Sequence, residues 1–224
     1  MTNLRVLNLS FNKLKSLSQF PVGLKNLDTL FLLNNELKSF KSGVFSNLDS
    51  LKSLEMDDNR IEVLEEGCFN GLVSLETLKL NTNMLKTIEQ SMFNGLGSLR
   101  QLILRNNQIE TVKTGSLDGL VNLELLDLSL NNLRKVETND FESLVKLKNL
   151  SLAENKLQSI GPGSFDTLGS LVSLDLSSNK LSNIDLYLFK NSLNLRYLNV
   201  NFNQIEFVDK ICLFNILPNL IDLF

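Results

Sequence analysis

Apolar positions recur with one period along the whole chain. Every segment reads L-x-x-L-x-L-x-x-N-x-L-x-x-L, with Ile, Val, Met or Phe replacing Leu at some positions. The segments start at Leu4, Leu27, Leu51, Leu75, Leu99, Leu123, Leu147, Leu171, Leu195 and Leu220. The spacing is 24 residues, except 23 in the first repeat and 25 in the last complete one. We therefore predict that residues 1–224 form a single repeat array of nine full repeats plus the start of a tenth.

The alternation within each repeat predicts a short strand. Leu78 and Leu80, for example, are two positions apart and lie on one face of an extended segment. One strand of this length cannot bury its apolar side alone, whereas stacked parallel copies can. The pattern therefore predicts a solenoid with a parallel sheet along one side.

One asparagine follows each strand at a position that faces the interior. An asparagine amide offers two donors and an acceptor, so a column of them can satisfy the backbone groups of the turn within and between repeats. We interpret this column as structural. Its members are Asn12, Asn35, Asn59, Asn83, Asn107, Asn131, Asn155, Asn179 and Asn203.

A large aromatic residue closes most repeats, and we expect these rings to fill the side of the core opposite the sheet. Leu117 replaces the ring once. The rings belong to Phe45, Phe69, Phe93, Phe141, Phe165, Phe189 and Phe214.

These motifs resemble the leucine-rich repeat family in its typical 24-residue extracellular subtype, and they look most like Toll-like receptor, Slit-type and small matrix proteoglycan ectodomains. The resemblance implies a curved right-handed horseshoe of the α/β type with a parallel β-sheet on its concave face. Extracellular members close both ends with cysteine-rich caps, which this sequence lacks. We therefore expect a piece of a longer protein, with any signal peptide and membrane anchor outside it.

Composition argues against catalysis and nucleic-acid binding. The chain has no histidine, the commonest general base and zinc ligand, and its net charge is −3. No run of about 18 apolar residues could span a membrane. We predict a protein that is not an enzyme and has no cofactor.

Two residue sets could still carry chemistry. Cys68 and Cys212 are about six repeats apart, or roughly 29 Å at a strand spacing of about 4.8 Å, which is too far for a disulfide. We interpret them as small buried apolar residues, with an intermolecular bond or a reactive thiol as the alternatives.

Glu55 and Asp57, with Asp58 beside them, form a carboxylate cluster. A calcium site and glycosidase-type chemistry are alternatives to a solvated or partner-binding face. Lys79 and Arg105 on later repeats place positive charge near the cluster, and an open sheet offers no cleft that would shift a pKa.

Function should lie in the variable positions of the sheet face, where exposed apolar groups indicate interaction sites. The first candidate surface combines apolar residues with a charged rim: Phe11, Phe31, Leu33, Glu55, Asp57, Asp58, Lys79 and Arg105. A second candidate patch contains Tyr197 and Phe202. Asn8 and Asn149 begin glycosylation sequons on or beside the strand face.

We thus expect a recognition module in a secreted or cell-surface protein that binds a protein, or a glycan, in innate immunity or cell adhesion. A matrix scaffold and an intracellular adaptor are the alternatives.

Overall fold

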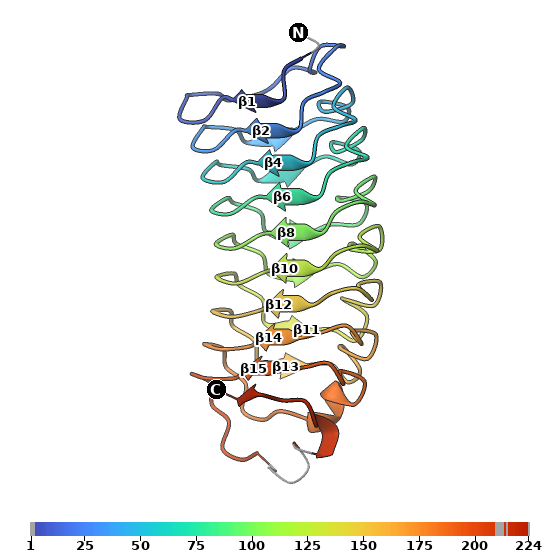
Figure 1. Ribbon diagram of the computed structural model, residues 1–224. Coiled ribbons are helices and arrows are strands. Elements are labelled where there is room, and N and C mark those ends of the chain that lie inside the picture. The colour runs from blue at the N-terminus through green and yellow to red at the C-terminus, as the bar shows by residue number, and fades with distance from the viewer. Residues whose placement is uncertain (1–2, 209–212, 214, 224) are drawn as a thin grey trace.

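The computed structural model describes residues 3–208, 213 and 215–223. Ten parallel strands form one continuous sheet along one side of a repeat solenoid (Figure 1). In order, they are β1 (Val6–Asn8), β2 (Thr29–Phe31), β4 (Ser53–Glu55), β6 (Thr77–Lys79), β8 (Gln101–Ile103), β10 (Leu125–Asp127), β12 (Asn149–Ser151), β14 (Ser173–Asp175), β15 (Tyr197–Asn199) and β16 (Asp222–Leu223). We number the turns of the solenoid as rungs 1 to 10 after these strands. The predicted parallel sheet is confirmed.

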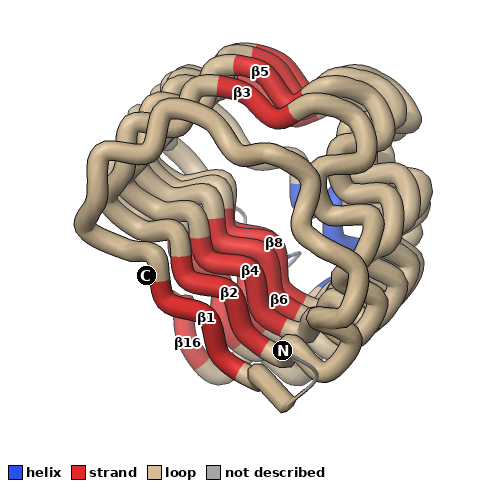
Figure 2. The backbone as a smooth tube through the Cα atoms, turned by 90° about the horizontal axis from the view of Figure 1, so that it is seen from above, coloured by secondary structure: helices blue, strands red, loops and turns tan. Residues whose placement is uncertain are grey.

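The side opposite the sheet is built of turns and very short strands (Figure 2). Three two-stranded parallel sheets lie there: β3 (Ser39–Phe40) with β5 (Val63–Leu64), β7 (Thr87–Ile88) with β9 (Thr111–Val112), and β11 (Lys135–Val136) with β13 (Ser159–Ile160). A 3-10 turn, η1 (Leu186–Phe189), lies in rung 8, where the side chain of Asp185 caps it by accepting from the Tyr187 N–H. We call this outer side of the solenoid the arc.

The strands pair with no slip in register. Leu30 aligns with Leu54, and Leu54 with Leu78, so each register step equals one sequence repeat. The alternation of the strand residues places the central leucine in the core and its two neighbours on the sheet face. One row on that face therefore runs Asn8, Phe31, Glu55, Lys79, Ile103, Asp127, Ser151, Asp175 and Asn199.

The asparagine column forms a continuous hydrogen-bond ladder. The Asn83 Nδ2 group donates to the carbonyl oxygens of Leu80 and Asn81 in its own rung and of Met56 in the preceding rung, each at 3.1 Å. Its Oδ1 accepts from the Ile61 N–H of the preceding rung at 2.9 Å. The same pattern repeats from Asn35 to Asn203. Each amide therefore joins two rungs through backbone groups that would otherwise be buried without partners.

The turn that aims each asparagine inward has an unusual backbone. The residue before each of the nine ladder asparagines has a φ between 50° and 57°, in the left-handed region. These residues are Phe11, Asn34, Asp58, Thr82, Asn106, Leu130, Glu154, Ser178 and Phe202. A side chain other than glycine pays about 1–2 kcal/mol to adopt this conformation, and the strain is repeated in every rung because the ladder requires the turn.

Phenylalanine rings stack along the arc side of the core. Phe45, Phe69 and Phe93 are nearly parallel, with 6.2 Å between successive ring centroids. Phe20 extends the stack at rung 1, and a second stack runs from Phe141 to Phe189. Leu117 interrupts the spine but is itself buried, with 1% of its surface exposed. Phe214 lies outside the described residues.

Cys68 belongs to the same apolar core, as its interpretation from sequence expects. It is fully buried and free, and burial raises the pKa of its thiol to about 12. At neutral pH the side chain is therefore an unreactive thiol rather than a thiolate. Cys212 lies outside the described residues.

Candidate partner-binding surface

Phe11 is the most exposed apolar residue of the first candidate surface. The left-handed turn of rung 1 projects its ring into solvent, and 77% of the residue is exposed. Phe31 and Leu33 on rung 2 lie behind it and are half-buried. The backbone fixes this arrangement, because the Phe11 N–H donates to the Leu33 carbonyl at 2.9 Å. The result is one protruding ring beside a shallower apolar base.

An ion pair on rungs 3 and 4 borders this apolar group. Glu55 aligns directly with Phe31 on one side and with Lys79 on the other. The Lys79 Nζ lies 3.1 Å from the Glu55 Oε1, and the two side chains are 36% and 17% exposed. The pair combines partial burial with direct register, so it forms a fixed polar edge beside the apolar group.

Asp57 differs from its predicted place on the exposed rim. Only 8% of the residue is exposed, and its Oδ1 accepts from the Asn81 N–H at 2.7 Å. Burial is the main cause that raises the pKa of this carboxyl above its usual value, and Glu55 and Asp58 raise it further. The expectation that the open sheet shifts no pKa is therefore wrong at this position. Asp57 is a structural link between rungs 3 and 4, whereas Asp58 is exposed at the left-handed turn.

Arg105 turns away from the carboxylate cluster. Its Nη1 donates to the Ser129 Oγ at 2.7 Å, and its Nη2 lies 3.5 Å from the Glu154 Oε1. It therefore joins rungs 5 to 7 and does not neutralise Asp57. The small side chains at the following positions explain this direction, because the buried Ser129 and Ala153 leave room for the guanidinium above the sheet.

The second candidate patch lies at the other end of the sheet. Tyr197 is 42% exposed on β15, and Phe202 is 84% exposed at the left-handed turn of rung 9. Phe207, which was not predicted from the sequence, follows on the same rung and is 78% exposed.

Both sequon asparagines are exposed: Asn8 lies on β1 and Asn149 on β12. A glycan on either residue would stand on the sheet face itself.

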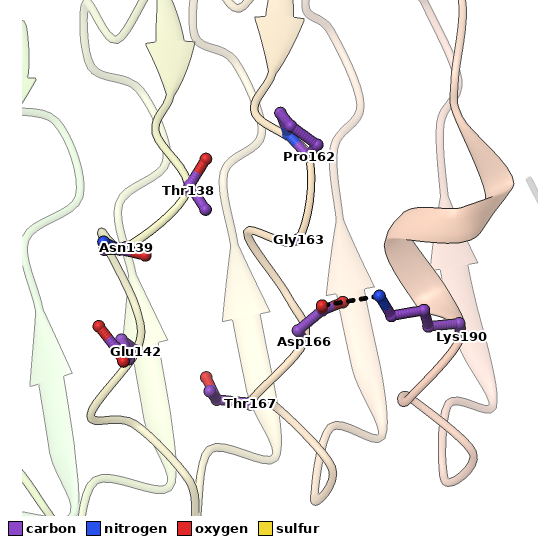
Figure 3. A pocket seen from close by; sticks show the side chains of 8 residues that line it. All are labelled: Thr138, Asn139, Glu142, Pro162, Gly163, Asp166, Thr167 and Lys190. Atoms are coloured by element: carbon purple, nitrogen blue, oxygen red, sulfur yellow. Dashed lines mark ion pairs between the residues drawn. The ribbon is translucent and has the colours of Figure 1, made fainter.

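A hollow of about 410 Å³ lies on the arc, far from the candidate surface (Figure 3). Asp166 and Lys190 point toward each other there and form an ion pair at 2.9 Å. Thr138 and Thr167 present hydroxyls, and Glu142 adds a second carboxylate to the lining. Among the described residues, no group of three or more His, Cys, Asp or Glu side chains could hold a metal ion.

A polar ladder on the flank where the chain enters the strands was missed from the sequence. Side chains just before a repeat's first leucine donate to the carbonyl of the preceding rung. Ser98 Oγ donates to Val73 at 2.7 Å and Asn122 Nδ2 to Gly97 at 2.7 Å. Ser170, Asn194 and Asn219 continue the series. The sequence signal for this ladder was the recurrence of Ser or Asn just before the first leucine of a repeat. This signal is weaker than that of the inner asparagine, which is the same residue in every repeat.

Within the described part of the chain, no helix has the length and apolar character that a membrane span requires. No sequence among the curated proteins matches this chain.

Two solved structures are similar over nearly the whole chain. One is a chain of the octameric complex of Latrophilin 3, Unc5D and FLRT2, whose leucine-rich repeats are those of FLRT2. It has a TM-score of 0.84 and 28% identity, over 99% of this chain and 67% of that one. The other comes from the Toll–Spatzle complex of Drosophila, with a TM-score of 0.84 and 27% identity, over 94% of this chain and 30% of that one. Both structures are assemblies of repeat proteins with protein partners.

Two family models together match almost every residue. The model described as leucine rich repeat matches residues 2–61 and 49–109, and the model for the BspA type leucine rich repeat region matches residues 86–218. Together with the asparagine ladder and the parallel sheet, these matches show that the chain belongs to the leucine-rich repeat family.

Proposed function

We propose that this chain is a recognition module that binds a protein partner over rungs 1 to 4 of its sheet face. The observation that carries the proposal is Phe11, an aromatic ring that is 77% exposed on a strained backbone. Phe31 and Leu33 provide an apolar base next to it, and the Glu55–Lys79 pair provides a polar edge. An apolar centre with a polar rim is the usual layout of a binding hot spot.

We place this activity outside the cell, on a secreted or cell-surface protein, with innate immunity or cell adhesion as its setting. The support is the similarity to repeat chains solved in complex with Unc5D and Latrophilin 3 or with Spatzle. The exposed sequon at Asn149 is compatible with this location.

Site-directed photocrosslinking tests the surface. A benzophenone amino acid at position 11 should capture a partner from secreted and cell-surface proteins. The same group at Glu66, which is exposed on the arc, should not. The captured protein is then purified and titrated against variants.

Phe11→Asn should weaken binding by about 30-fold, which corresponds to the roughly 2 kcal/mol expected of a hot-spot residue. Asparagine tolerates the left-handed backbone, so the fold should be unaffected. Phe202→Asn is the matched control, because it makes the same change at the same position of rung 9. Equal affinity for Phe11→Asn and wild type would refute the proposed surface, and a loss confined to Phe202→Asn would move the site to the second patch.

A further inference from the structure

Two parallel rows of side chains run along the flank where the chain enters the strands, outside the proposed binding surface. The valine row consists of Val73, Gly97, Val121, Val145, Gly169 and Leu193, one residue on each of rungs 4 to 9. The charge row consists of Glu76, Arg100, Glu124, Lys148, Val172 and Arg196 on the same rungs. The register of the strands fixes both rows, since each member is one repeat from the next.

The valine row is exposed without a structural need. Val73, Val121, Val145 and Leu193 are 59%, 47%, 51% and 55% exposed. A Cβ at Gly97 would meet nothing within 4 Å, so the fold does not require glycine there. The polar ladder described above bonds to the carbonyls of this row, for example Ser170 Oγ to Val145 at 2.9 Å. The row is therefore a rigid apolar strip whose small members would allow close approach of another surface.

Reversing the rung order leaves the valine row almost unchanged. About a point between rungs 6 and 7, Val121 is opposite Val145, Gly97 is opposite Gly169, and Val73 is opposite Leu193. A two-fold axis perpendicular to the sheet at that point would reverse both the rung order and the strand direction, so it would set each row against its own reverse in a second copy. Large residues would then meet large ones, and the two glycines would meet each other.

The same axis makes the charge row complementary to itself. Glu124 would face Lys148 of the second copy, and Glu76 would face Arg196. Within the described chain, neither Glu76 nor Arg196 takes part in an ion pair. Arg100 would face the uncharged Val172, and it is already paired with Glu124 of its own chain. The axis thus gives partners to the two charges that lack one.

We propose that two copies of this chain associate antiparallel through the flank of rungs 4 to 9, about a two-fold axis between rungs 6 and 7. An isologous contact requires this self-complementary pattern. An axis between rungs 3 and 4 would also pair opposite charges, but it would set Asp49 against Val73 and bury a carboxylate on an apolar side chain. Six rungs at about 4.8 Å span roughly 29 Å, so the interface is small and the dimer is weak, with dissociation in the micromolar range or above.

A charge exchange distinguishes this dimer from other self-association. In a homodimer of Glu76→Lys, two introduced lysines face two arginines; in a homodimer of Arg196→Glu, two introduced glutamates face Glu76. Each variant alone should dissociate at least about tenfold more readily than wild type, because two contacts change from attraction to repulsion. An equimolar mixture restores opposite charges at both contacts, so it should form a heterodimer of near wild-type affinity.

Sedimentation equilibrium over a concentration series measures all of these species. Lys86→Glu, which reverses an exposed charge on the opposite flank, is the matched control and should leave association unchanged. Wild-type chains that remain monomeric to about 0.5 mM would overturn the proposal, since even a weak interface forms there. It is also overturned if both charge variants associate like wild type, or if mixing them restores nothing.

Discussion

Replacing the ladder asparagine Asn83 with leucine tests the ladder most directly. The change removes four hydrogen bonds, three donated by Nδ2 and one accepted by Oδ1. The three carbonyls keep another donor each: Asn59 still bonds to Met56, Asn107 to Leu80, and the Asp58 N–H to Asn81. Of the four groups, only the Ile61 N–H is left without a hydrogen-bond acceptor.

The expected cost follows from that single orphaned group. A buried donor without a partner costs about 1–3 kcal/mol, and the carbonyls lose only a second bond. Leucine has the right size but cannot recover this loss by burial, because backbone polar groups line the slot. We therefore expect Asn83→Leu to lower the free energy of unfolding by about 1–3 kcal/mol, measured as a lower midpoint in urea at an unchanged slope.

Asn12→Leu is the matched control. Asn12 occupies the same position on rung 1, but it is exposed and its Nδ2 donates only within its own turn, to Leu9 and Ser10. Its replacement should cost less than about 1 kcal/mol. If both variants lose the same stability, the effect arises inside the turn and the bonds between rungs are irrelevant. An unchanged or higher midpoint for Asn83→Leu would refute the ladder argument altogether.

Three further changes have defined outcomes. Phe69→Ala should lower the free energy of unfolding in urea by about 3–5 kcal/mol, because it opens a cavity between two stacked rings; a loss below about 1 kcal/mol would contradict the stacked core. Asp57→Asn should gain stability relative to wild type as the pH rises above about 4. The raised pKa of the carboxyl means that its contribution is fully present below the unfolded pKa and is lost as the pH rises through the folded one; a stability difference independent of pH in urea titrations would disprove this reading. In a Cys212→Ser background, Cys68 should react with a thiol reagent at pH 8 only after unfolding, and fast reaction of the folded chain would show that the thiol is accessible.

The repeated positions were predictable because their chemistry is the same in every rung. The spacing of leucines determines which side chains face the core, and the inner asparagine is the one polar residue that can satisfy the turn. The structure adds the left-handed residue before each asparagine, which the sequence does not reveal. Phe, Leu, Asp, Glu, Ser, Thr and Asn all occupy that position, so no residue type marks it. The strain is imposed by the ladder and not by local preference.

The candidate site was predicted less well because its residues vary from rung to rung. The repeat spacing alone placed Asp57 and Lys79 on the sheet side. It could not show whether either side chain is exposed at the rim of the surface or buried between two rungs. The outcome depends on reach: Asp57 is short enough to bond the Asn81 N–H and become buried, whereas Lys79 extends to Glu55. Arg105 lies two rungs from Asp57 as predicted, but its long side chain turns toward the open space that Ser129 and Ala153 provide in the next rungs.

Phe11 and Phe202 are exposed aromatic residues at the same left-handed position of rungs 1 and 9. Both occupy the left-handed turn, where seven residue types occur in this chain and an asparagine would cost less than a phenylalanine. Both rings are mostly exposed, at 77% and 84%, so neither recovers the strain by packing within the chain. The valine row on the flank has the same property, since the fold gains nothing from its exposure. Exposed apolar side chains that contribute no packing are candidates for contacts with another molecule, and they are the basis of both the proposed partner surface and the proposed dimer.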